Sequence, residues 1–225
     1  MAKRLTILRL ICLSGLMISS FVYSLIISPV TASMGELTRI LYFHVPLAWV
    51  AVIAFFVAGI MAIIFLKNSN HTCFAYFHSS AEIGMVFIIL TTVTGAVWAK
   101  NTWGSYWNWD PRQTSVFILM LIYFGYFAYY SATGKDAAHN RTLAVYIILA
   151  LCAVPFLVFI IPRMQATLHP EPVINAQKKI TMEPSMFNAL IISVIAYTAF
   201  YIELLIISAK TMIVKNNILM KKLYD

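Results

Sequence analysis

Charged residues are scarce in this chain of 225 residues, which contains 16 Lys and Arg and 8 Asp and Glu. These residues make up 11% of the sequence, and 61% of it is hydrophobic. A soluble domain has about 25% charged and about 45–50% apolar residues. The chain therefore lacks the polar surface of a water-soluble globule, which excludes a soluble enzyme, a disordered chain and a nucleic-acid-binding domain. We interpret the net charge of +8 as a sign of membrane topology.

Cysteine motifs and nucleotide-binding loops are also lacking. Cys12, Cys73 and Cys152 lie far apart, so there is no C-x-x-C pair for a thiol–disulfide relay and no C-x-x-C-H motif for covalent haem attachment. No Gly-rich loop ends in Gly-Lys-Ser or Gly-Lys-Thr, which argues against an ATPase site in this polypeptide. Any energy input is therefore expected from a partner protein.

Six long apolar windows dominate what is present. A transmembrane helix needs about 20 apolar residues, and none of the windows alternates with the period of two that is typical of membrane β-strands. We predict an all-α integral membrane protein, a single domain over residues 1–225 that forms a bundle of six transmembrane helices. The predicted spans are 10–28, 45–66, 79–98, 113–131, 142–162 and 187–208.

The distribution of Lys and Arg predicts how the bundle is oriented, because cytoplasmic segments carry an excess of these residues. With the N-terminus in the cytoplasm, ten Lys and Arg residues lie inside and six lie outside. We therefore expect both termini in the cytoplasm. The predicted periplasmic loops are 29–44, 99–112 and 163–186.

The first window permits a second interpretation. Lys3, Arg4 and Arg9 precede an apolar run, which is also the pattern of a cleavable signal peptide. The run is nearer to about 19 residues than to the about 7–15 of a signal peptide, which favours a retained span.

Aromatic residues are concentrated in the second predicted periplasmic loop and just before it. The segment 98–109 holds four of the five tryptophans and Tyr106. Tryptophans gather at membrane interfaces in general, but this density favours a flat aromatic surface for a large, planar, apolar ligand.

Asp110 and Pro111 are typical of the N-cap and first position of the next helix. Arg112 opposes the dipole of that helix, and a carboxylate from Asp110 or from a ligand would offset this cost.

The residues at this point resemble a known family. The run Trp103-Gly104-Ser105-Tyr106-Trp107-Asn108-Trp109-Asp110 resembles the W-G-x-x-W-x-W-D signature of haem-handling proteins in cytochrome c biogenesis. The segment from Arg39 to Trp49 resembles the surroundings of the first haem-ligand histidine of the CcmC family, and Thr167-Leu168-His169 resembles those of the second. The sequence departs from the family pattern at 164–166, where an aromatic pair is common, and at Pro111, where a small residue is common.

The resemblance implies a haem site. His44 and His169 would be the two axial ligands of the iron. The implied aromatic platform and propionate partners are Trp103, Gly104, Tyr106, Trp107, Trp109, Asp110 and Arg112. Four other cations on the predicted outer side, for which a solvated role is favoured, are Arg39, Lys100, Lys178 and Lys179.

The resemblance also implies a function. The chain would carry haem b as a transient cargo at the periplasmic face of a bacterial inner membrane and pass it to the haem chaperone CcmE. It would work with the ABC transporter subunits CcmA and CcmB and with the small membrane subunit CcmD, as a transport component rather than an enzyme. Two alternatives are a b-type membrane cytochrome, which typically has paired histidines within the bundle, and a secondary transporter with a midplane site.

The remaining titratable residues are expected near the cytoplasmic side. His71, His78 and His139 fall in or beside short cytoplasmic loops, and we interpret them as solvated loop residues. Glu82 and Glu203 lie within predicted spans, close to their cytoplasmic ends. Carboxylates inside a membrane are candidates for function in general, but we assign these two no haem role.

Overall fold

The computed structural model describes residues 2–133, 137–170 and 182–224, and within these ranges it contains helices and no β-strand. Its longer helices are α1 (Ala2–Val22), α2 (Leu41–Asn68), α3 (His71–Trp103), α4 (Pro111–Ala132), α5 (Ala137–Val154) and α7 (Pro184–Tyr224). Its shorter elements are the π-helical turn η1 (Tyr23–Ile27), the 3₁₀ helix η2 (Glu36–Ile40), the π-helical turn η3 (Pro155–Ile160) and α6 (Ile161–Met164).

Six helical segments among the described residues are long and apolar enough to cross a membrane, which confirms the predicted all-α fold of six such helices. The helices are longer than the predicted windows, chiefly where polar residues continue them. The third starts at His71 rather than near residue 79, and the second starts at Leu41. His44 therefore lies in the first turns of α2 rather than in a loop.

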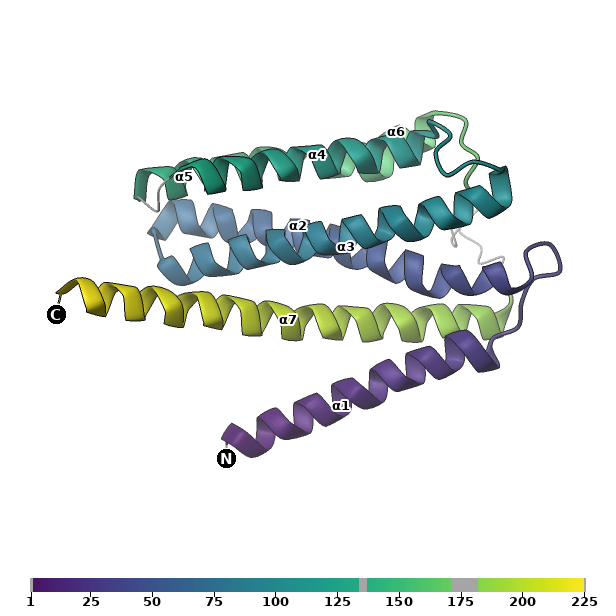
Figure 1. The fold of residues 1–225 in the computed structure, drawn as a ribbon, viewed down its shortest axis with the longest axis horizontal. Coiled ribbons are helices and arrows are strands. Elements are labelled where there is room, and N and C mark those ends of the chain that lie inside the picture. The colour runs from purple at the N-terminus through teal and green to yellow at the C-terminus, as the bar shows by residue number, and fades with distance from the viewer. Residues whose placement is uncertain (1, 134–136, 171–181, 225) are drawn as a thin grey trace.

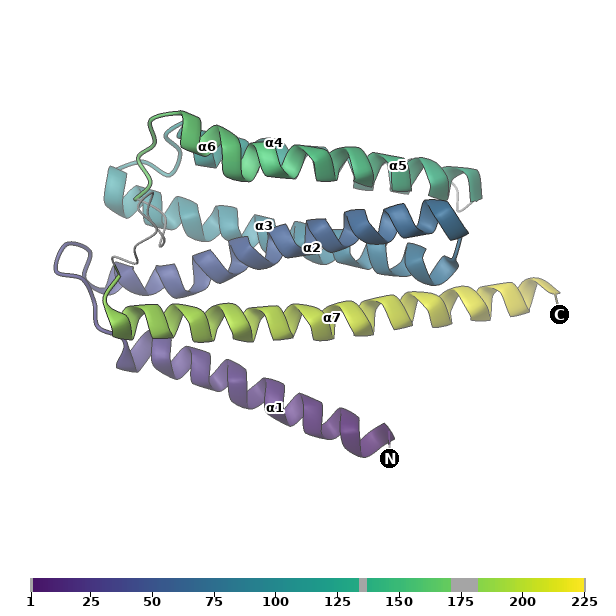
Figure 2. The same cartoon turned by 180° about the vertical axis from the view of Figure 1, so that it is seen from behind.

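The helices run side by side, and their connections separate cleanly onto two ends of the molecule. In Figures 1 and 2, α4, α5 and α6 lie along one side, α2 and α3 occupy the middle, and α7 and α1 lie along the other side. The start of α1 and the end of α7 lie at the same end as the α2–α3 connection, the end of α4 and the start of α5, here called the terminal end (Figure 1). The segments 28–40, 104–110 and 165–170 lie at the opposite end, here called the loop end.

Small residues bring α2 and α3 into close contact at the centre of the bundle. Alanines at three- and four-residue intervals on α2, including Ala54 and Ala58, are fully buried. Gly84 of α3 faces them so closely that a Cβ atom there would lie 2.6 Å from Phe55 Cε1. Small residues at such interfaces let helix backbones approach each other without leaving voids. This central pair of helices is the rigid support for the residues at both ends.

Helix α1 packs at the edge of the bundle, where polar contacts fix it to α7. Ser193 of α7 lies 2.9 Å from the hydroxyl of Ser20 and 3.0 Å from that of Ser24. Arg9 reaches the buried carboxylate of Glu203 through two contacts of 2.8 and 2.9 Å. Glu203 therefore has a structural partner in α1, because a buried carboxylate is stable only when it is paired.

The interpretation of His78 as a solvated loop residue was wrong. His78 lies on α3 and is only 2% exposed, and its Nδ1 atom is 2.6 Å from the hydroxyl of Tyr126 on α4. The sequence window for the third span began one residue after it, because the polar residues His71 and Ser79 lower the local hydropathy although the helix continues through them.

Candidate ligand site at the loop end

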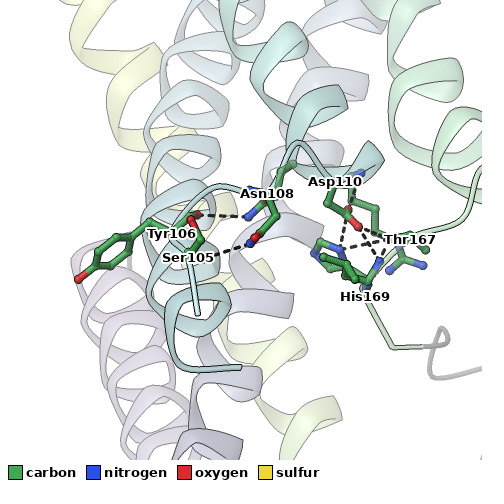
Figure 3. Close-up of polar contacts among 9 residues, drawn as sticks. Ser105, Tyr106, Asn108, Asp110, Thr167 and His169 are labelled. Carbon is green, nitrogen blue, oxygen red and sulfur yellow. Dashed lines mark hydrogen bonds and ion pairs between the residues drawn. The ribbon is translucent and has the colours of Figure 1, made fainter. Parts of the chain in front are cut away.

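Three stretches of sequence meet at the loop end of the bundle. The first turns of α2 bring His44. The α3–α4 connection brings Asp110, and the segment after α6 brings His169 (Figure 3). The α3–α4 connection starts where Gly104 ends α3 with φ +81°, a conformation that favours glycine. It stops at Asp110, whose side chain caps α4, and at Pro111 in the first turn, as the sequence predicted.

The carboxylate of Asp110 is the centre of this site. Its Oδ1 accepts hydrogen bonds from the Arg112 backbone amide at 2.9 Å and from the His169 ring at 2.8 Å. Its Oδ2 accepts from the Thr167 hydroxyl and from the Leu168 backbone amide, both at 2.7 Å. Figure 3 shows these bonds converging from two separate loops. Because the side chain of Asp110 is fully buried, its four partners hold the segment 167–169 against the start of α4.

The ionised state of Asp110 sets the tautomer of His169. Burial raises the pKa of the Asp110 carboxyl, but the hydrogen bonds from Thr167 and the backbone amides outweigh it and lower the pKa below its ordinary value. A carboxylate only accepts hydrogen bonds, so Nδ1 of His169 carries the proton. Burial, the largest cause, also lowers the pKa of His169, which keeps the ring neutral. Its Nε2 atom therefore has a free lone pair.

His44 has the same tautomer for a different reason. Its Nδ1 atom lies 3.1 Å from the hydroxyl oxygen of Thr94 on α3. The single hydroxyl proton of Thr94 is directed to the backbone carbonyls of the preceding helical turn, at 2.9 and 3.1 Å. With that proton directed to a carbonyl, we assign Nδ1 of His44 as the donor to the Thr94 oxygen. No hydrogen bond is found at Nε2 of either His44 or His169 within the described part of the chain, and the His44 ring also lies within reach of the Thr91 backbone carbonyl.

The position of the His44 ring depends on a glycine. A Cβ atom at Gly95 would lie 2.8 Å from Cε1 of His44, so only glycine leaves room for the ring against α3. His44 contacts α3 at Thr94 and Gly95. His169 lies beside Trp98, about one turn further along the same helix. The two imidazoles with free Nε2 atoms thus belong to one site.

The tryptophans form two separate groups rather than the single flat surface expected from the sequence. Trp98 and Trp103 pack edge to face at 81°, and both lie beside His169, with ring centroids 6.2 and 4.9 Å from its imidazole. Trp107 and Trp109 form a second pair, at 85°. Trp109 is 75% exposed and has φ +55°. Only the first pair encloses a candidate ligand residue.

Hydrogen bonds within the α3–α4 connection hold its remaining residues. The side-chain amide of Asn108 donates to the Ser105 carbonyl at 3.1 Å, and the Asn108 backbone amide donates to Gln113 at 3.0 Å. The side chain of Tyr106 points away from His169 in Figure 3 and is 60% exposed. Gly104 and Tyr106 therefore belong to the connection without contacting the histidines.

The cations at the loop end differ in their partners. Arg39 donates to the Ser24 and Ser28 carbonyls at the end of η1 and to Glu36, and Lys100 donates to the Gly104 carbonyl. By contrast, the Nε atom of Arg112 is buried and has no hydrogen-bond partner among the described residues. Lys178 and Lys179 lie outside the described residues, as does the central part of the predicted loop 163–186.

Sequence reasoning did not include Trp98, Thr94, Gly95 or Thr167 in the site. Three of these residues lie in the last turns of α3, on the side of His44 and His169. Their three- and four-residue spacing from 94 to 98 is a helical signal, but it acquires meaning only once α2 is known to pack against α3. Thr167 was treated only as part of a short motif, although its hydroxyl bonds to Asp110.

Comparison with known proteins identifies one family. A family model described as "Heme exporter protein C", CcmC, matches residues 1–223. A protein of this name from Rhodobacter capsulatus is 28% identical over 200 residues, which are 87% of this chain and 81% of that relative. A protein of the same name from Bradyrhizobium diazoefficiens is 28% identical over 199 residues, or 87% of this chain and 74% of its own. A putative cytochrome c biosynthesis ccmC-like mitochondrial protein of Arabidopsis thaliana is 39% identical over 102 residues, or 45% of this chain and 40% of its own.

Replacement of Asp110 by alanine should release the segment 167–169. Removing the acceptor of a buried hydrogen bond to a charged group costs about 1.5–3 kcal/mol, so the Leu168 amide should exchange its hydrogen about tenfold faster or more. Hydrogen exchange followed by mass spectrometry of the detergent-purified protein measures this rate. Ser105→Ala is the matched control, because its hydroxyl bonds only within the α3–α4 connection. An unchanged Leu168 rate in Asp110→Ala would show that another contact holds the segment.

Proposed function

Because the chain belongs to the heme exporter protein C family, we propose that it holds haem between His44 and His169 at the loop end and delivers it during cytochrome c biogenesis. It is a multi-pass membrane protein and a haem-handling transport component, as its family and its six apolar helices indicate. The observation that carries the proposal is the pair of neutral imidazoles with unpartnered Nε2 atoms at one site.

The two histidines suit haem iron chemically. Imidazole nitrogen is a common axial ligand of haem iron, and a ligating histidine usually donates its other ring proton to an oxygen, which fixes the ring and raises its basicity. Asp110 supplies that oxygen for His169, and Thr94 supplies it for His44. The carboxylate is the stronger acceptor, so His169 is the more basic of the two proposed ligands. We propose haem b as the cargo. The sequence contains no C-x-x-C-H motif, so the haem would be held by its ligands and by packing rather than by thioether bonds.

The surroundings of the two histidines suit the porphyrin ring and the propionates of haem. Trp98 and Trp103 offer apolar area beside His169 for one edge of the porphyrin ring. Arg112 is the proposed partner of a propionate, since its buried Nε atom lacks an acceptor and a carboxylate would provide one. Trp107 and Trp109, with Gly104 and Tyr106, belong to the second, more exposed group, which we propose as the surface that contacts the haem edge and a partner protein.

Delivery requires that the bound state be reversible. His44 belongs to a rigid helix, whereas His169 belongs to a loop that is fixed mainly by Asp110. A partner that binds the loop end can therefore shift the position of His169 without disturbing the bundle. The chain would then have two states, one with His169 in place and one with it displaced. The partner can take up the haem only if the displaced state binds haem more weakly. We propose the haem chaperone CcmE as the acceptor, and CcmA, CcmB and CcmD as the other members of the haem export complex.

The orientation in the membrane follows from the charge distribution. Lys and Arg are in excess at the terminal end, and this excess favours a cytoplasmic position. We propose that the loop end, with the segments 28–40, 104–110 and 165–170, faces the periplasm of a bacterial inner membrane. Haem held by His44 and His169 is then presented on the side where c-type cytochromes are assembled.

His44→Ala and His169→Ala should each abolish the low-spin absorption spectrum of haem in the detergent-purified protein. Each substitution removes one of two strong-field ligands, so the iron that remains bound should be high-spin. His71→Ala, at the terminal end, is the matched control and should leave the spectrum unchanged. A low-spin spectrum in the His44→Ala/His169→Ala double variant would refute this ligand assignment.

Trp103→Ala should weaken haem binding by about two- to tenfold, the equivalent of an aromatic contact of about 0.5–1.5 kcal/mol. Trp107→Ala and Trp109→Ala should weaken it less, since these rings lie in the group that does not contact His169. Titration of the apoprotein with haem measures the affinities. Trp49→Ala serves as control, because Trp49 is a half-exposed tryptophan on the outside of α2. Equal losses in all four variants would point to a general aromatic belt rather than to a site.

A further inference from the structure

A cavity lies at the terminal end of the bundle, at the opposite end from His44 and His169. It has a volume of about 1020 Å³ and is lined by residues of α3, α4, α5 and α7. Small-molecule pockets have volumes of about 300–1,000 Å³, so this cavity suits a large ligand. In Figures 1 and 2 the start of α3 and the last turns of α7 lie at this end, far from the α3–α4 connection.

The inner wall of this cavity is built around His78. Its ring lies parallel to that of Phe74, at an interplanar angle of 6° and a centroid distance of 5.9 Å, and 4.1 Å from the ring of Tyr130. The hydroxyl of the buried Tyr126 fixes Nδ1 of His78 at 2.6 Å. Its Nε2 faces the carboxylate of Glu82 at 3.3 Å, and the side chain of Glu82 is half exposed. The aromatic wall therefore presents one supported imidazole, whose second nitrogen is covered by a side chain that has room to move.

The rim of the cavity differs in character from its wall. Lys215 and Asn217 of α7 line it and are exposed, as is His71 at the start of α3. These side chains offer one cation and several hydrogen-bond donors, the groups that bind carboxylates. A ligand that matches both parts has a broad apolar ring system and an edge that carries carboxylates.

We propose that this cavity is a second haem site, at which the protein receives haem at the terminal end with His78 Nε2 as a reversible axial ligand. The proposal rests on the proposed haem-delivery function and adds a loading step to it. In all three histidines a protein oxygen lies at Nδ1, but Nε2 of His78 also faces the carboxylate of Glu82, which only accepts hydrogen bonds, so Nε2 carries the ring proton in this structure. Binding of iron by Nε2 requires Glu82 to turn aside and the ring proton to move to Nδ1, where the Tyr126 oxygen accepts it. This competition keeps the site weak enough for loading.

The two sites do not communicate through an open channel. Midway along the bundle, Phe55 of α2 stacks on Tyr123 of α4 with a centroid distance of 3.7 Å, and both side chains are fully buried. A porphyrin cannot pass between packed helices without separating them. The terminal-end cavity is therefore a distinct loading site rather than the inner part of the site at the loop end.

The test uses the full-length His44→Ala/His169→Ala variant in detergent, titrated with ferric haem and with iron-free protoporphyrin IX after subtraction of binding to empty micelles. We expect this variant to bind both ligands. The added substitution His78→Ala should lower the affinity for ferric haem by about tenfold or more and leave the affinity for protoporphyrin unchanged. Retained protoporphyrin binding also shows that the variant is folded. The control Trp49→Ala, on the outside of α2, should leave the affinities for both ligands unchanged, and Tyr130→Ala should weaken the binding of both.

Three outcomes would overturn the proposal: neither ligand binds the double variant, His78→Ala leaves the affinity for haem unchanged, or His78→Ala lowers the affinities for haem and protoporphyrin equally. The last would show that His78 shapes the cavity without binding iron. Failure of the loop-end assignment has a different signature, because the double variant would then keep its low-spin spectrum before His78 is altered.

Discussion

The buried carboxylate of Asp110 joins parts of the chain that are distant in sequence, and the loop-end site depends on it. It caps α4, holds the segment 167–169 and directs the ring of His169. A carboxylate without partners would be costly at this depth, so the site forms only when all of these contacts form together. The last residue of the tryptophan motif is thus the one that connects this motif to the second histidine.

The two halves of the site differ in rigidity, which matters for a carrier. His44 is placed by the closely packed pair α2 and α3, where Gly95 leaves exact room for its ring. His169 is placed by a loop and one carboxylate. The rigid His44 side of the site preserves selectivity for the ligand. The His169 side depends on a few hydrogen bonds, so a partner can rearrange it at a modest cost in free energy. Binding and release can therefore be controlled at one end while the core stays intact.

The sequence predicted the six-helix architecture well, because long apolar windows are a property of the chain itself. It also predicted the cap at Asp110 and Pro111. It could not predict which side chains meet across helices. Trp98 and Thr94 gain their places only from the packing of α3 beside α2, and the edge-to-face pairing of the tryptophans depends on the turn at Gly104. His78 was misplaced because hydropathy marks where a helix is apolar, not where it begins.

The central claim is that two imidazole Nε2 atoms, presented by α2 and by the segment after α6, bind one haem iron. Electron–nuclear double resonance of the ferric haem-loaded protein, prepared with ¹⁵N-labelled histidine, tests it most directly because it detects the nitrogens bound to the iron. The account predicts hyperfine couplings from two histidine nitrogens on a low-spin iron. Coupling to a single histidine nitrogen, or to none, would contradict it.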